Sequence, residues 1–159
     1  MAENISFVKV KVLFVLFASL IFLPKSSQHA YAQDDPASKA LLLFGGEDHK
    51  TFLGCLNCSD KSAVSICNEY DQYGSPYRTD SIWNEYGTYG SKYRQDSPWN
   101  KYGRNAPIIV DKDGTSYGYF SANAYHPDRT KVKWLVKILD AEAKEDDLKV
   151  AHAMLCADE

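Results

Sequence analysis

The sequence has little positive charge and no run of basic residues. Its 159 residues include 18 Lys or Arg against 21 Asp or Glu, which gives a formal net charge of −3 at pH 7. Proteins that bind nucleic acid normally carry a basic patch that neutralises phosphates, and anionic membrane surfaces attract basic segments. The composition therefore argues against nucleic acid and against a membrane surface as partners.

Long apolar runs are also missing, apart from a short one near the start. Val12–Pro24 is almost wholly apolar, but a helix that crosses a bilayer needs about 20 such residues. Lys9 and Lys11 precede this run, and Ala30–Ala32 follows it with the small-x-small pattern of a cleavage site. These features predict a signal peptide over residues 1–32, with an uncleaved anchor as the alternative. They place the protein in the periplasm or outside the cell.

Motifs of common catalytic sites are absent. The chain contains no G-x-S-x-G, no H-E-x-x-H and no phosphate-binding loop. After residue 32, His49, His126 and His152 lie far apart, with no spacing typical of a metal site or a triad. We therefore predict a protein that is not an enzyme and has no cofactor. The alternative is an accessory envelope enzyme that uses a polar cluster of His126, Asp128 and Arg129.

The chain has four cysteines, all of them after the predicted leader: Cys55, Cys58, Cys67 and Cys156. An even number in an exported chain predicts two disulfides. A four-thiolate zinc site and a redox-active C-x-x-C pair are the alternatives. We prefer Cys55–Cys156 with Cys58–Cys67, because the first bond would close a loop of about 100 residues and such loops gain most from a cross-link. Cys55–Cys58 with Cys67–Cys156 is the second choice.

A sixteen-residue phrase repeats between about residues 65 and 103. The units read CNEYDQYGSPYRTDSI (67–82), WNEYGTYGSKYRQDSP (83–98) and WNKYG (99–103). Each unit predicts two tight turns, one that begins at a Ser before the Trp position and one at Tyr-Gly-Ser, where Gly can take a positive φ. Cys67 occupies the position of Trp83 and Trp99, which indicates that this position faces inward.

The aromatic residues of the repeat have two interpretations. Their rings can replace an aliphatic core, or some of them can face solvent as a stacking platform for sugar rings. The second interpretation predicts a non-catalytic binding or structural module that contacts envelope polysaccharide or another exported protein. A calcium role for Asp80 and Asp96 is a weaker alternative, because clustered D-x-D ligands are absent. The candidate binding residues are Tyr70, Tyr77, Trp83, Tyr86, Tyr93, Trp99 and Tyr102.

The flanks of the repeat predict regular structure. Residues 40–44 and 51–54 resemble two short strands, and residues 107–110 and 115–123 form a hairpin around Asp111–Gly114. The turn is preferred to an EF-hand loop, because Gly114 comes two residues too early for one.

Two helices follow in the prediction. Asp128 or Thr130 can cap a first helix that runs to about Asp140, with Val132, Leu135, Val136 and Leu139 on its buried face. Asp146–Asp147 can start a second helix, with Leu148, Ala151, Met154 and Leu155 turned inward, and one long helix to Cys156 is the alternative. Residues 33–38 are a polar lead-in, and residues 39–159 are predicted to form one small, disulfide-stabilised α+β domain.

Several phrases of the chain together resemble one group of proteins. TFLGCLNC, the tandem WN-x-Y-x-x-YGS-x-Y units, SPWN and GYFSAN-x-YHPDRT lie between Thr51 and Thr130. In wording they are similar to a group of small exported bacterial proteins. The resemblance implies export and a fold built on the repeat, and it brings no assigned activity.

Overall fold

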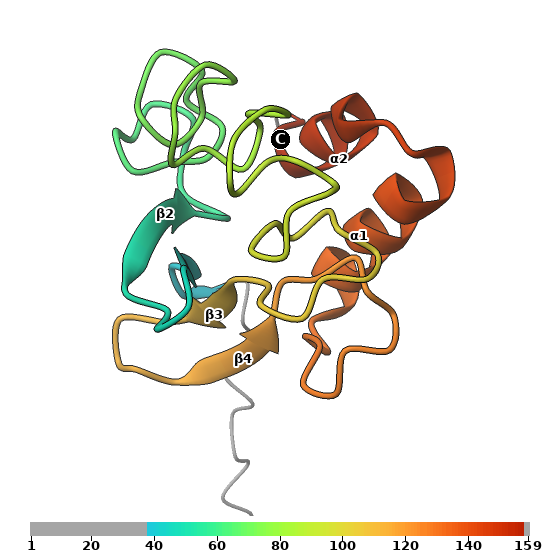
Figure 1. Ribbon diagram of the computed structural model, residues 1–159. Coiled ribbons are helices and arrows are strands. Elements are labelled where there is room, and N and C mark those ends of the chain that lie inside the picture. Colours follow the sequence, from blue (N-terminus) through green and yellow to red (C-terminus); the bar gives the residue numbers. More distant parts are fainter. Residues whose placement is uncertain (1–37, 158–159) are drawn as a thin grey trace, which may run out of the picture. The chain divides into compact units, whose positions relative to one another are not determined.

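The sheet of this protein brings together strands from both sides of the repeat. The computed structural model describes residues 38–157, so the predicted signal peptide lies outside the described residues. Strands β1 (Leu42–Gly45), β2 (Thr51–Cys55), β3 (Ile108–Val110) and β4 (Ser116–Tyr119) form one antiparallel sheet in the order β2-β1-β3-β4 (Figure 1). The repeat lies between β2 and β3, so the pairing of β1 with β3 brings its two ends to the same sheet.

The β3–β4 hairpin is confirmed, and its turn is held by one carboxylate. Asp111 accepts hydrogen bonds from the backbone N–H groups of Asp113 and Thr115, each at 2.9 Å, and from the Tyr117 hydroxyl at 3.0 Å. Lys39 adds an ion pair at 3.4 Å. Burial would raise the pKa of Asp111, but the bonds from Thr115, Tyr117, Lys39 and Asp113 outweigh it and hold the pKa at about 2. The carboxylate is therefore a fixed part of the turn.

Two helices end the described chain. Helix α1 (Lys133–Glu145) stops at Asp146, which has a left-handed φ of 56°, and Asp147 caps helix α2 (Leu148–Leu155) by accepting a bond from the Lys149 N–H. The prediction of two helices rather than one is confirmed. The expectation that Asp128 or Thr130 caps the first helix is wrong, because α1 begins after Val132 without a side-chain cap.

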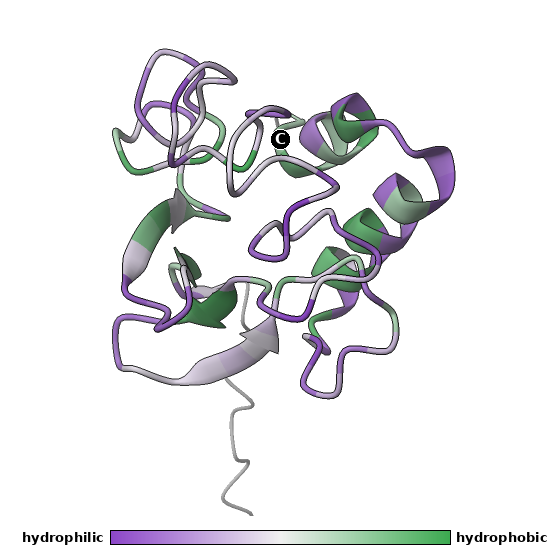
Figure 2. Cartoon of the chain, in the orientation of Figure 1, coloured by the Kyte–Doolittle hydropathy of each residue, from purple (hydrophilic) through white to green (hydrophobic). Residues whose placement is uncertain are grey.

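The core lies where the sheet, the repeat and the helices meet. Leu43, Leu53 and Ile109 come from the sheet, while Leu135 and Leu139 come from α1. Figure 2 shows hydrophobic stretches on β2 and on parts of both helices, with hydrophilic stretches between them. The repeat completes this cluster with fully or almost fully buried side chains. These are Ile66, Ile82, Trp83 and Trp99. The predicted α+β class is thus confirmed.

Both disulfides are present, but with the pairing that we ranked second. Cys55 bonds Cys58, and Cys67 bonds Cys156. The preferred pairing, Cys55–Cys156 with Cys58–Cys67, is wrong because geometry outweighs loop entropy. The chain turns directly after β2 and brings the Cα atoms of Cys55 and Cys58 to 5.5 Å, whereas Cys67 has its Cα 5.4 Å from that of Cys156. All four thiols are consumed, which also excludes the four-thiolate zinc site.

Candidate functional site

The repeat folds as an unbroken series of hydrogen-bonded turns. Each turn is closed by a backbone N–H that donates to the carbonyl three or four residues earlier, and the residue that closes one turn accepts the bond of the next. Four three-residue steps and one four-residue step give the sixteen-residue period. The closing residues in the repeat are Ser65, Asn68, Asp71, Ser75, Arg78, Ser81, Asn84, Gly87, Ser91, Arg94, Ser97, Asn100 and Gly103.

Ser81–Trp83 and Ser97–Trp99, the same three positions of successive units, are buried in the core. Ser81 and Ser97 are fully buried, and each Oγ accepts the backbone N–H two residues on, from Trp83 and Trp99. The Trp99 indole N–H donates to the Ile82 carbonyl at 2.6 Å, and the Trp83 indole makes the same bond one unit earlier. The two indoles stack with their ring centroids 5.5 Å apart. These tryptophans form an interior ladder.

This burial corrects part of the predicted binding surface. Trp83 is 5% exposed and Trp99 is 1% exposed, so neither ring has a face free for a ligand. Cys67 occupies the same ladder position and is tied to Cys156. The indication that this position faces inward is therefore confirmed, and both tryptophans leave the set of candidate contact residues.

Five of the seven tyrosines in the repeat point outward, whereas Tyr73 packs against Phe52 and Tyr89 is buried. Five of the predicted contact residues are between 80% and 95% exposed, and a sixth tyrosine outside the repeat is 94% exposed. Such large exposed rings at regular intervals are unusual on a protein surface and mark interaction sites. We call this set the tyrosine array. Its members are Tyr70, Tyr77, Tyr86, Tyr93, Tyr102 and Tyr125.

Every tyrosine of the array has its backbone anchored in the same way. Its N–H donates to a side-chain oxygen two residues earlier, as in Asx and Ser turns. For four of the tyrosines the acceptor is an Asn, for example Asn84 for Tyr86 at 3.1 Å. For the other two it is a Ser: Ser75 accepts from Tyr77 at 3.4 Å and Ser91 accepts from Tyr93 at 3.5 Å. Each array tyrosine is thus held at its backbone by a local hydrogen bond, while its ring extends into solvent.

The asparagines connect neighbouring turns. While Asn84 Oδ1 accepts from Tyr86, its Nδ2 donates to the Arg78 carbonyl at 3.1 Å, six residues earlier. Asn100 repeats both bonds with Tyr102 and Arg94. One amide therefore fixes the outward tyrosine and the preceding turn together, which explains why Asn recurs at this position.

The recurring Tyr-Gly-Ser glycines are needed for space. A Cβ on Gly74 would lie 2.2 Å from the Asn68 carbonyl oxygen, and one on Gly90 would lie 2.1 Å from that of Asn84. Neither glycine has a positive φ, so the expectation that these turns use a left-handed glycine is wrong. Close approach of two backbone segments is the physical reason for glycine here.

Sequence reasoning missed Tyr125, although a signal for it exists. Asn123 Oδ1 accepts the Tyr125 N–H at 3.0 Å, and Asn123 Nδ2 donates to the Gly103 carbonyl at 3.0 Å. This is the same device as in the repeat, placed after the third unit. The segment Ser121–Tyr125 reads S-x-N-x-Y, one residue shorter than the S-x-W-N-x-Y of the repeat, and this difference hid the match.

The residues of the alternative polar cluster are only partly brought together. Arg129 donates to the Ser121 carbonyl and to Asp140, both at 2.7 Å. The His126 ring lies against Tyr119 with centroids 4.5 Å apart, and its Nε2 lies 3.3 Å from the Arg104 carbonyl oxygen. Asp128 and Arg129 line a hollow beside β4, but His126 is not among the described residues that line it.

A second hollow, of about 400 Å³, lies beside the tyrosine array. Tyr86 and Tyr93 of the array line it, together with residues from the end of α1 and the start of α2. Glu142 of α1 lines it as well and is only 2% exposed. Burial raises the pKa of Glu142 to about 7, with the charge of Lys101 opposing the shift. We call this the tyrosine-side pocket.

Metal and membrane sites are not evident in residues 38–157. No three His, Cys, Asp or Glu side chains of that range gather in a way that could hold a metal ion. Within the same range, no helix has both the length and the apolar character to cross a bilayer.

Comparison with other proteins adds no relative. No protein-family model, no curated protein and no solved structure matches the chain.

Proposed function

We propose that this protein is an exported, non-catalytic binding module whose tyrosine array contacts envelope polysaccharide. The observation that carries the proposal is the array itself, six tyrosines that are at least 80% exposed and are each anchored at the backbone. Keeping such rings in water forgoes the free energy of burying them, so their recurrence calls for a use outside the core. Tyrosine also offers a large contact area at a low cost in side-chain entropy, because it has only two torsions.

The regular spacing favours a polymer with short repeating units over a folded protein partner. Trp83 and Trp99, which occupy the same position in successive units, have their ring centroids 5.5 Å apart, a distance comparable to the length of one sugar residue in an extended chain. Sugar rings offer apolar faces to aromatic rings, while their hydroxyls can bond the tyrosine hydroxyls at the rim. The acidic composition does not favour a nucleic acid as the polymer. Export is supported by the two disulfides and the predicted leader.

Co-sedimentation with purified cell-wall glycan and exopolysaccharide tests this function. We expect saturable pelleting of the oxidised protein, which soluble glycan then reverses. Replacing Tyr70, Tyr86 and Tyr102 together by Ala should weaken the affinity about a hundredfold, at roughly 1 kcal/mol or more for each ring. The melting temperature should not change, because these rings are exposed.

The matched control keeps the rings and removes only the hydroxyls. With Tyr70, Tyr86 and Tyr102 all replaced by Phe, we expect most of the binding to remain if stacking dominates. Absence of pelleting by the native protein, or equal pelleting by the alanine variant, would refute glycan binding by the array. A protein partner would then be the next candidate.

A further inference from the structure

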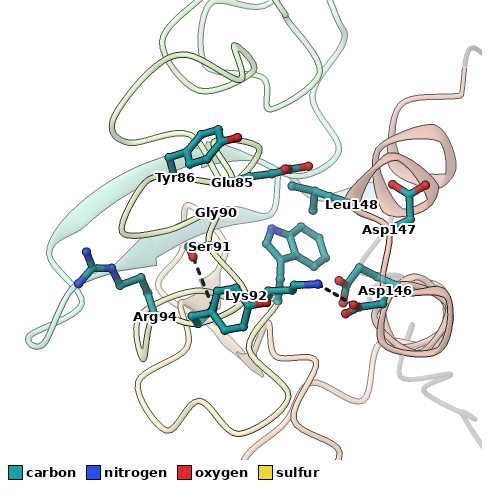
Figure 3. Close-up of a pocket in the computed structure, with 12 residues that line it drawn as sticks. Glu85, Tyr86, Gly90, Ser91, Lys92, Arg94, Asp146, Asp147 and Leu148 are labelled. Carbon is teal, nitrogen blue, oxygen red and sulfur yellow. Dashed lines mark hydrogen bonds and ion pairs between the residues drawn. The ribbon is translucent and has the colours of Figure 1, made fainter.

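The tyrosine-side pocket joins the array to the helices. Figure 3 shows Glu85 and Tyr86 on one side of it and Asp147 and Leu148 on the other, with the Lys92 side chain extending to Asp146. A volume of about 400 Å³ is in the range of small-molecule sites and suits one sugar residue. Because Tyr86 and Tyr93 belong both to the array and to the pocket lining, a glycan held by the array would lie next to the pocket.

The pocket contains a buried acid with one oxygen that makes no hydrogen bond in the described structure. Glu142 lies on the inward face of α1, and its Oε2 atom is buried with no hydrogen-bond partner in the described structure. A buried polar atom that makes no hydrogen bond is costly, at about 1–3 kcal/mol. Such atoms are rare in folded proteins and call for an explanation, of which a missing ligand is one.

The nearby cations are directed at a different acid. Lys92 Nζ lies 2.6 Å from an Asp146 oxygen, and Lys101 Nζ lies 3.4 Å from the other. Asp147 is held by the start of α2. The remaining charged residues that line the pocket are Glu85 and Arg94. Glu142 is therefore the acid of this pocket that is best placed to receive a hydrogen-bond donor from outside.

We propose that the pocket receives one sugar residue with a free amino group, whose ammonium donates to the Glu142 carboxylate while its ring lies beside Tyr86 and Tyr93. This inference rests on the proposed glycan binding and specifies the class of sugar. An ammonium supplies both the donor and the compensating charge that a buried carboxylate needs, whereas an acetylated amine supplies a donor alone. The structure thus predicts a preference for amino sugars over N-acetylated ones.

Titration calorimetry with two matched probes tests the preference. The probes are a glucosamine tetrasaccharide and an N-acetylglucosamine tetrasaccharide, which differ only in the acetyl groups. We expect the native protein to bind the first at least about tenfold more tightly, since a charge-assisted hydrogen bond contributes about 1.5–3 kcal/mol. Glu142→Gln should abolish the preference, and Glu145→Gln, an exposed neighbour on the same helix, should retain it.

A second measurement does not depend on affinity. In the free protein the carboxyl carbon of Glu142 should titrate with a pKa of about 7, in the presence of the neighbouring Lys92, Lys101 and Asp146. Saturation with the glucosamine probe should lower that pKa, because the ammonium favours the charged form. Near-ultraviolet circular dichroism checks that Glu142→Gln retains the native fold.

The outcomes separate the two proposals. Equal affinity for both probes, an unchanged preference in Glu142→Gln, or a Glu142 pKa that does not move would each overturn the amino-sugar site. If glycan still pellets the protein through the array, only the pocket assignment fails. If neither probe binds and no glycan pellets the protein, both proposals fail.

Discussion

The tryptophans and the array tyrosines of the repeat share one local hydrogen bond, from the backbone N–H to a side-chain oxygen two residues earlier, but their side chains lie in opposite environments. Trp99 and Tyr102 each follow, by two residues, a polar side chain that accepts their N–H, yet Trp99 is 1% exposed and Tyr102 is 83% exposed. The two side chains differ in what their polar group contacts. The Trp99 indole N–H donates to the Ile82 carbonyl of the preceding unit, whereas the Tyr102 hydroxyl makes no hydrogen bond to the described residues. One face of the repeat therefore stabilises the fold, and the other is exposed to solvent.

The largest predicted effect concerns the interior position that holds a cysteine instead of a tryptophan. Replacing Cys67 and Cys156 by Ala removes a cross-link between residues 89 positions apart, and should lower the free energy of unfolding by roughly 4–5 kcal/mol. Replacing Cys55 and Cys58 by Ala, which opens a loop of only three residues, should cost less. Urea denaturation measures both, and an equal loss would contradict the role of the longer link.

Removing an interior ring should have the next largest effect. Trp99→Ala creates a cavity and leaves the Ile82 carbonyl without its indole partner, at a cost of about 3–5 kcal/mol. Tyr102→Ala, three residues later, should change the stability by less than about 0.5 kcal/mol, because its ring is exposed. If the two variants unfold at the same urea concentration, the inside–outside distinction is wrong.

The asparagines that link turns should have an intermediate effect. Asn84→Ala deletes the acceptor of the Tyr86 N–H and the donor to the Arg78 carbonyl, which should cost about 1–2 kcal/mol. Ser retains the acceptor but cannot reach the carbonyl, so Asn84→Ser should recover about half of the loss. Thermal unfolding gives both values. A neutral Asn84→Ala would show that the turns do not depend on these amides.

The last prediction is a dependence of stability on pH that comes from Glu142. Its pKa is raised from the ordinary 4.5 to about 7, so between these values the folded state holds a proton that the unfolded chain releases. This contribution to stability is complete below the ordinary pKa and is lost as the pH rises through about 7. Glu142→Gln should flatten the decline between pH 5 and 7, as measured by urea unfolding. If the free energy of unfolding depends on pH equally in Glu142→Gln and in the native protein, the Glu142 carboxyl is hydrated rather than buried.

Much of the framework can be predicted from sequence because its signals are local. The hairpin follows from Asp111–Gly114 between apolar runs, and the two helices follow from apolar spacing with Asp146–Asp147 as the break. The inward direction of the tryptophan position follows from its exchange with Cys67. Each of these inferences needs only neighbours within one element or one repeat unit.

The direction of the tyrosines and the pocket depend on contacts between distant segments. Tyr86 is exposed, whereas Tyr89, three residues later, is only 9% exposed because it packs beside Gly45 of β1, a contact that lies outside the repeat. Glu142 left a weak signal, since it lies seven residues after the buried Leu135 on the same helix face. Loop entropy likewise misled the disulfide prediction, because the local turn that joins Cys55 to Cys58 decides the pairing.

Chemical footprinting of the tyrosines tests whether the exposed rings bind glycan, since one experiment reports on the inner and outer rings together. Nitration of the oxidised protein, mapped by mass spectrometry with and without cell-wall glycan, gives the reactivity of each ring. We expect the six tyrosines of the array to react in the free protein and to be protected by glycan, while Tyr89 reacts poorly in both states. Array tyrosines that react equally with and without glycan, under conditions where the glycan pellets the protein, would show that glycan does not bind through the array.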